Sequence, residues 1–106
     1  MRDFMFTAAD VFFIQAWKKW DLACARISLT AEVEARNGRR YYPPAMALQS
    51  ETEALVEAKA RLAEELGISH VHLMRALLEL RHDGVDHAKC VRLVRQYLEQ
   101  LSYATS

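Results

Sequence analysis

The fold is decided by the stretch Arg61-Leu-Ala-Glu-Glu-Leu-Gly-Ile-Ser-His-Val-His-Leu-Met-Arg-Ala-Leu-Leu-Glu-Leu80. Apolar residues recur three and four positions apart on both sides of its single glycine, which is the spacing of two amphipathic helices. Gly67 can adopt the positive φ that ends the first helix, and the hydroxyl of Ser69 can cap the second. We therefore expect a helix that ends at Gly67, a short turn, and a second helix from about His70 to His82.

The chain before this stretch carries two further helix starts. Thr7-Ala-Ala-Asp10 matches the capping box, in which the first and fourth residues exchange hydrogen bonds at a helix N-terminus. The helix that follows runs to Asn37-Gly38, which is a typical helix stop. A break near Ser28-Leu29-Thr30 is the alternative, and it would give two shorter helices. Ser50-Glu-Thr-Glu53 is a second capping box and predicts the start of the helix that ends at Gly67.

The last helix follows a break at Asp83-Gly84, with Asp86 as its cap. We expect it to carry its apolar residues inward and its bases on the other side, and residues 102–106 to fray. The expected inward residues are Cys90, Val91, Val94, Tyr97, Leu98 and Leu101. The bases on the other side are Lys89, Arg92 and Arg95.

Composition favours an all-α fold. The 106 residues are 52% hydrophobic and 26% charged, as in folded globular chains. Three glycines, two prolines and the lack of alternating β-branched runs argue against sheet. We expect a single domain, residues 1–106, built as a small bundle of four or five helices with one long N-terminal helix and a hairpin near 61–80.

The charge balance and the two cysteines indicate which partners and which cellular compartment to expect. Fourteen basic and fourteen acidic residues cancel, which counts against nonspecific nucleic-acid binding but allows a locally basic face. Cys24 and Cys90, without a secretion signal, favour a reduced, cytoplasmic setting, where they pack as small hydrophobes; a bridge between them stays open. No apolar run reaches the roughly 18–20 residues of a membrane span, so we expect no membrane partner.

The N-terminal helix is unusually aromatic at its start. Its expected inward stripe consists of Phe13, Trp17, Trp20, Cys24, Ile27 and Ala31. Because apolar residues nearly surround its first turns, we expect a homodimer contact there. The residues assigned to this interface are Phe12, Phe13, Trp17 and Trp20.

Ala63, Gly67 and Leu73 follow the spacing Ala-x3-Gly-x5-apolar. This segment resembles the helix-turn-helix of bacterial DNA-binding regulators. The resemblance covers residues 61–80 and implies that the helix over 69–81 enters the major groove of double-stranded DNA. The positions it implies at the groove are Ser69, His70, Val71, Met74 and Arg75. The bases then available for backbone phosphates are Arg81, Lys89, Arg92 and Arg95.

A basic, aromatic loop is a further candidate contact. Arg39 and Arg40 precede Tyr41 and Tyr42, and arginine can bind phosphate while tyrosine can stack on bases. The alternative is a solvated loop whose tyrosines lie on the core. The two prolines that follow end any regular structure at this point.

The sequence shows no catalytic pattern. It has no glycine-rich phosphate loop, no His-Glu-x-x-His and no nucleophile elbow, so we expect no enzyme activity, no catalytic residues and no cofactor. The cluster of His82, Asp83, Asp86, His87 and Cys90 contains ligand types that zinc accepts. Gly84 separates these residues onto two helices, so we expect structural roles for them and no bound metal.

Three functions follow from these features. The first interpretation is a small DNA-binding transcription regulator that acts as a homodimer, with two copies of the 69–81 helix in successive major grooves. The alternative is a helical protein-interaction module, such as an adaptor or inhibitor encoded by a mobile element. That module would use the acidic helix 50–66, whose five acids outweigh Lys59 and Arg61, together with the loop Arg39–Tyr42. A subunit of a nucleoprotein complex is a third.

Overall fold

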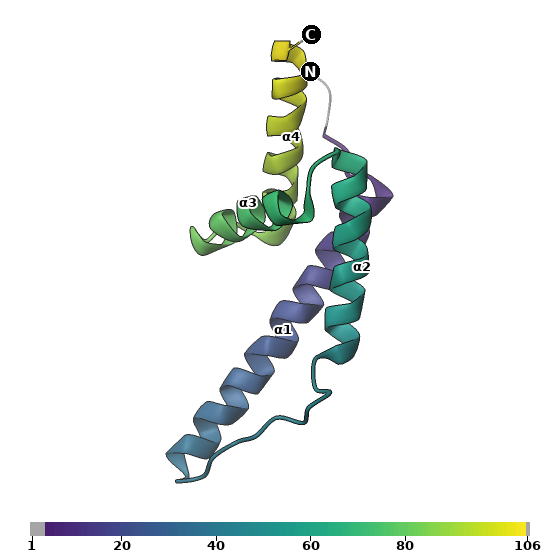
Figure 1. The fold of residues 1–106 in the computed structure, drawn as a ribbon. Coiled ribbons are helices and arrows are strands. Elements are labelled where there is room, and N and C mark those ends of the chain that lie inside the picture. Colours follow the sequence, from purple (N-terminus) through teal and green to yellow (C-terminus); the bar gives the residue numbers. More distant parts are fainter. Residues whose placement is uncertain (1–3, 106) are drawn as a thin grey trace.

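The computed structural model describes residues 4–105, and the side chains of residues 4–101. The described residues form four helices: α1 (Ala8–Arg36), α2 (Gln49–Leu66), α3 (His70–His82) and α4 (His87–Thr105) (Figure 1). The described residues contain no strand, which confirms the all-α prediction. The long N-terminal helix is also confirmed, and it continues through Ser28–Thr30 without a break.

The molecule is elongated, with principal dimensions of 61 × 25 × 23 Å. Figure 1 shows α2 running antiparallel to the first part of α1, α3 crossing near the start of α4, and the last turns of α1 extending past α2. The segment 37–48 then returns from the far end of α1 to the start of α2.

The capping box at the start of α1 is confirmed. The hydroxyl of Thr7 accepts a hydrogen bond from the Asp10 N–H at 3.2 Å, and the Thr7 N–H donates to the Asp10 carboxylate at 3.0 Å. The predicted end of the helix is also confirmed, because Asn37 is its C-cap and Gly38 has φ +73°. Both ends therefore follow from residues within one turn.

The predicted capping box at Ser50–Glu53 is wrong. The helix α2 begins earlier, at Gln49, and its N-cap is Leu48, which makes no side-chain capping bond. A turn after Pro44 leads into the helix, with the Ala47 N–H bonded to the Pro44 carbonyl at 3.0 Å. Ser50 thus already lies inside the helix, where its backbone is helical and its hydroxyl is no longer at the cap position.

The core lies where the four helices meet, around the first half of α1. Its buried apolar residues are Phe13, Ile14, Ala16, Trp17, Ala58, Leu62, Ala63, Leu73, Leu77, Cys90, Val91 and Val94. Two predicted inward positions of the last helix are wrong, because Tyr97 and Leu101 are exposed. They lie in the C-terminal half of α4, where Tyr97 borders an open hollow between α3 and α4.

The inward stripe predicted for α1 is only partly buried. Phe13 and Trp17 are in the core, whereas Trp20, Cys24 and Ile27 are half-buried. No residue of α1 after Trp17 is buried, and the structure describes all of this helix. Helical periodicity identified the correct side of α1, but the neighbouring helices do not reach its far end.

Both cysteines are free. Cys90 is buried, and its thiol donates to the Val85 carbonyl at 3.4 Å; desolvation raises the pKa of this thiol. Cys24 is half-buried, and desolvation together with the nearby charge of Asp21 raises its pKa. Since the thiolate is the reactive form, both groups are poor nucleophiles at neutral pH.

We expect alkylation by iodoacetamide at pH 7.5 to be slow in the native protein and faster at Cys24 than at Cys90. Burial excludes the reagent from Cys90, so this thiol should react only when the core opens. Peptide mass spectrometry over a time course, with and without urea, measures both rates. Equal rates in the native protein would contradict the difference in burial.

Candidate interaction site on helix α3

The turn between α2 and α3 has defined local geometry. Gly67 ends α2 in the left-handed region with φ +71°, and its N–H donates to the Glu64 carbonyl at 3.2 Å. The next N–H, of Ile68, reaches the Ala63 carbonyl at 3.1 Å. These two bonds form a Schellman motif. The Ser69 hydroxyl then accepts the His72 N–H at 3.2 Å, so the predicted cap of α3 is confirmed.

The buried side of α3 fixes which residues face outward. Leu73 and Leu77 are fully buried, and Ala63 packs in the same core. The opposite side carries Val71, which is 71% exposed, and Leu78, which is 52% exposed. Met74 is half-buried between them. We call Val71, Met74 and Leu78 the α3 stripe.

The α3 stripe borders a shallow groove of about 500 Å³ between α2 and α3. Polar and charged side chains surround its apolar residues. The groove is lined by Lys59, His70, Val71, Met74, Arg75, Leu78 and Glu79. Because Lys59 and Arg75 are opposed by a single acid, Glu79, this surface is apolar with a weakly basic rim.

The structure does not bring the other predicted nucleic-acid residues to this groove. Arg81 donates to the Val85 carbonyl at 2.9 Å and lies 4.0 Å from the Asp21 carboxylate. The guanidinium of Arg92 lies 5.5 Å from the ring centroid of Phe4. These two arginines therefore have intrachain neighbours that compete with a phosphate.

The remaining bases are also dispersed. Lys89 and Arg92 line a hollow beside the N-terminal segment, on a different side of α4 from the one that faces α3. Arg39 lies 3.8 Å from Glu34, and Arg40 is exposed, both in the segment that follows α1. The residues predicted to contact nucleic acid thus lie in separate regions, and among them only Ser69, His70, Val71, Met74 and Arg75 share the start of α3.

The predicted position of Arg95 on the outer side of α4 is wrong. Its guanidinium points into the molecule and binds Asp10 through two hydrogen bonds of 2.8 and 3.0 Å. Glu65 and the Thr7 hydroxyl complete the cluster. Asp10 is fully buried, so its carboxylate requires this partner. No local pattern in the sequence indicates this contact, which spans 85 residues.

The sequence did not predict a second polar contact, which joins His87 and Asp21. The Nε2 atom of His87 lies 2.5 Å from the Asp21 carboxylate, and its ring meets Trp17 edge-on at 4.7 Å. This contact joins α1 to the start of α4. Asp86 caps α4 by accepting the Ala88 N–H at 3.1 Å, as predicted. Within the described residues, no three His, Cys, Asp or Glu side chains are grouped so that they could hold a metal ion.

The aromatic residues assigned to a dimer interface have different environments. Phe13 and Trp17 are buried within the chain, with ring centroids 5.6 Å apart. Trp20 is half-buried. Phe12 is exposed, and the guanidinium of Arg61 lies 5.4 Å from its ring centroid. Two of the four residues thus belong to the core and offer no surface to a second chain.

Comparisons with models of protein families, with curated proteins and with solved structures find no match. None of the helices within residues 4–105 combines the length and the apolar character needed to cross a membrane.

Proposed function

We propose that this protein is a helical protein-interaction module that binds another protein through the α3 stripe. The observation that supports it is the exposure of Val71 and Leu78 on a helix whose other side is firmly packed. Apolar side chains at positions i, i+3 and i+7 are the pattern by which a helix docks into the apolar groove of a partner. Exposed apolar surface with a polar rim marks such sites.

The charge distribution favours a protein partner over nucleic acid. Binding to a duplex depends on several lysines and arginines that neutralise phosphates together. Here the net charge is zero, and Arg81 and Arg95 are engaged within the chain. A protein partner requires only the apolar stripe and complementary charges opposite Lys59, Arg75 and Glu79.

A DNA-binding regulator is the second candidate, because a specific observation favours it. Ala63 is buried, Gly67 is left-handed and Leu73 is buried, so each residue has the role that a helix-turn-helix gives to its position. The start of α3 is exposed at Ser69, His70 and Arg75. In this function Arg75 would read guanine and Ser69 would bind phosphate.

We expect Val71→Asp combined with Leu78→Asp to abolish partner binding, because it places two charges in an apolar interface. Proximity labelling in the native host, with the tagged full chain, gives the partner set. Val56→Asp is the matched control, since Val56 is also an exposed helical valine, on α2. The surface variants should change the free energy of unfolding by no more than about 0.5 kcal/mol.

Titration with random-sequence duplex DNA across salt separates the two candidates. The interaction module predicts no binding at low salt by the native chain. Binding that weakens steeply with salt and disappears in Arg75→Glu would replace the proposed function with the DNA-binding regulator. Partners that the double variant and Val56→Asp retain equally would also contradict the α3 stripe as the binding surface.

A further inference from the structure

The second half of α1 extends beyond the core. Residues 18–36 form an arm about 28 Å long, and none of them is buried. Figure 1 shows the arm continuing past the start of α2. In proteins most of the stability of a helix comes from packing of one face. One side of the arm is half-buried, at Trp20, Cys24 and Ile27 among others, and the opposite side is exposed. That exposed side is a candidate for contact with another chain.

The outer side of the arm carries a regular pattern. Exposed residues along one line of α1 recur at alternating spacings of three and four, which is the seam of a two-helix pair. We call these residues the arm seam: Gln15, Lys18, Leu22, Ala25, Leu29, Glu32 and Arg36. Leu22 is 56% exposed and Leu29 is 63% exposed. The side of α1 that faces the core shares none of these residues.

We infer that the arm seam pairs with the arm seam of a second copy of this chain, antiparallel and centred on Ala25. In this register Lys18 lies opposite the partner's Glu32, and Leu22 lies within one residue, about 1.5 Å along the helix axis, of the position opposite the partner's Leu29. Two-fold symmetry repeats each contact, so the interface contains two apolar pairs and two ion pairs. The small side chain of Ala25 at the centre allows the two helices to approach closely.

Charge selects the antiparallel arrangement. A parallel pair would place Lys18 against the partner's Lys18 and Glu32 against the partner's Glu32, and like charges in contact are unfavourable. Glu32 bonds Arg36 at 2.9 Å within the chain, but both side chains are exposed, and such pairs contribute little. Glu32 is therefore able to bind a second cation.

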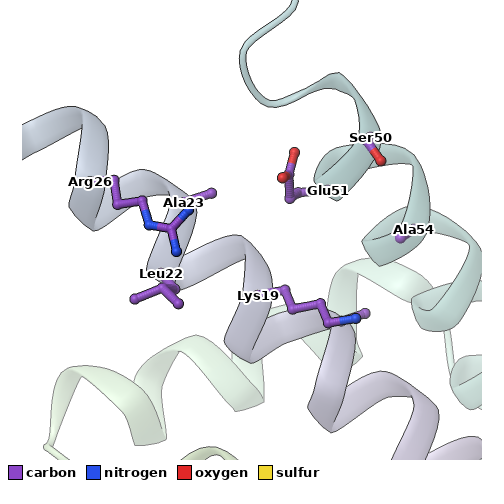
Figure 2. Close-up of a pocket in the computed structure, with 8 residues that line it drawn as sticks. Lys19, Leu22, Ala23, Arg26, Ser50, Glu51 and Ala54 are labelled. Carbon is purple, nitrogen blue, oxygen red and sulfur yellow. The ribbon is translucent and has the colours of Figure 1, made fainter.

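A groove between α1 and the start of α2 lies beside the seam. Figure 2 shows Lys19 and Arg26 of α1 and Glu51 of α2 along one groove of about 280 Å³, which Leu22 also lines. In the antiparallel pair the two copies of Arg26 approach each other near the centre. Glu51 places a negative charge in the same groove and reduces their repulsion. The arm seam shares no residue with the α3 stripe, so the two surfaces can be tested independently.

Sedimentation velocity on the full chain tests the association. We expect the native protein at micromolar concentration to sediment as a species with twice the chain mass of 12.2 kDa. Leu22→Glu with Leu29→Glu should sediment as a monomer, while Val56→Glu, an exposed apolar position on α2, should remain dimeric. Circular dichroism confirms that each variant is folded. A monomeric native chain, or a double variant that stays dimeric, would overturn the inference.

Charge exchange tests the register. Lys18→Glu alone and Glu32→Lys alone should each weaken the dimer at least about fivefold in Kd. The two together should restore the native Kd, because each ion pair is re-formed with reversed sign. Failure of the double variant to recover would exclude this register.

Disulfide trapping tests the direction of the helices. In a Cys24→Ser background, Ala25→Cys should form a disulfide across the two-fold axis, where the two Cα atoms come within bonding reach. Val33→Cys should not, because two copies of residue 33 would lie about 24 Å apart along antiparallel helices. Efficient trapping of both variants would indicate a parallel dimer and contradict the inference.

Discussion

Replacing Arg95 with methionine is expected to lower the free energy of unfolding by about 3 kcal/mol. The substitution leaves the carboxylate of Asp10 in the core without its cation. Asp10 is fully buried, and the side chain of Arg95 is only 14% exposed. Urea unfolding followed by circular dichroism measures the loss, compared with the native chain under the same buffer and protein concentration.

The expected loss of stability follows from the geometry of the contact between Arg95 and Asp10. Arg95 binds both oxygens of Asp10 through its Nε and Nη2 atoms, and a bidentate pair of this kind is stronger than a single contact. The same carboxylate closes the capping box of α1 by accepting the Thr7 N–H. Loss of Arg95 therefore also weakens the site where α1, α2 and α4 are tied together by Thr7, Glu65 and Arg95.

The contribution of Arg95 should not depend on pH in the neutral range. Burial alone would lower the pKa of its guanidinium, but the hydrogen bonds and charges of Asp10 and Glu65 outweigh burial and raise it. A base whose pKa is raised by folding stabilises the native state fully below its unfolded pKa. That contribution is lost only as pH rises through the higher folded pKa, far above the range of roughly pH 5 to 9.

Arg92→Met is the matched control for Arg95→Met. Arg92 lies three residues earlier on the same helix, and its guanidinium rests over the ring of Phe4 at the surface. We expect it to cost less than about 1 kcal/mol. Combining Arg95→Met with Asp10→Asn should cost less than the sum of the two single changes, since the uncompensated charge is removed. Equal small losses at both arginines would contradict the buried pair.

Much of the local structure could be predicted because it depends on residues close in sequence. The capping box at Thr7, the left-handed Gly67 and the cap at Ser69 each involve groups within one or two turns. The prediction of a capping box at Ser50 also used only nearby residues, and it is wrong. The residues there fit a capping box, but the turn after Pro44 starts the helix earlier than that pattern indicates.

The contacts between distant residues could not be predicted. Asp10 with Arg95 and Asp21 with His87 join residues 85 and 66 positions apart, and their sequence neighbourhoods contain no signal of either pair. Periodicity identifies which side of a helix is apolar but not how far a neighbouring helix covers it. For that reason the predicted inward stripe of α1 is buried at Phe13 and Trp17 but only half-buried from Trp20 to Ala31.

The candidate site on α3 could be predicted only in part. The spacing around Gly67 correctly placed the start of α3 at the surface, since Leu73 and Leu77 had to face inward. The grouping of the basic residues was not predictable, because it depends on how α4 packs. Arg95 turns toward Asp10 and Arg92 toward Phe4, which removes two of the cations that the sequence offered to a phosphate backbone.

Trp17→Ala is expected to lower the free energy of unfolding by about 4 kcal/mol. Trp17 is among the largest fully buried side chains. It packs against Phe13 with ring centroids 5.6 Å apart and meets the ring of His87 at 4.7 Å. Its removal leaves a large cavity between α1 and α4, and it also deprives His87 of the surface that holds its ring beside Asp21. Urea unfolding by circular dichroism measures the change.

Trp20→Ala is the internal control, because it removes the same side chain one turn later on α1. Trp20 is half-buried, so we expect a loss of roughly 1–2 kcal/mol, in proportion to the smaller area withdrawn from water. Measurements at low and high protein concentration separate folding from association, since a dimer contact makes the midpoint depend on concentration. A loss at Trp17 no larger than that at Trp20 would contradict its place in the core. A loss at either tryptophan that appears only at high concentration would assign that residue to an interface between copies instead.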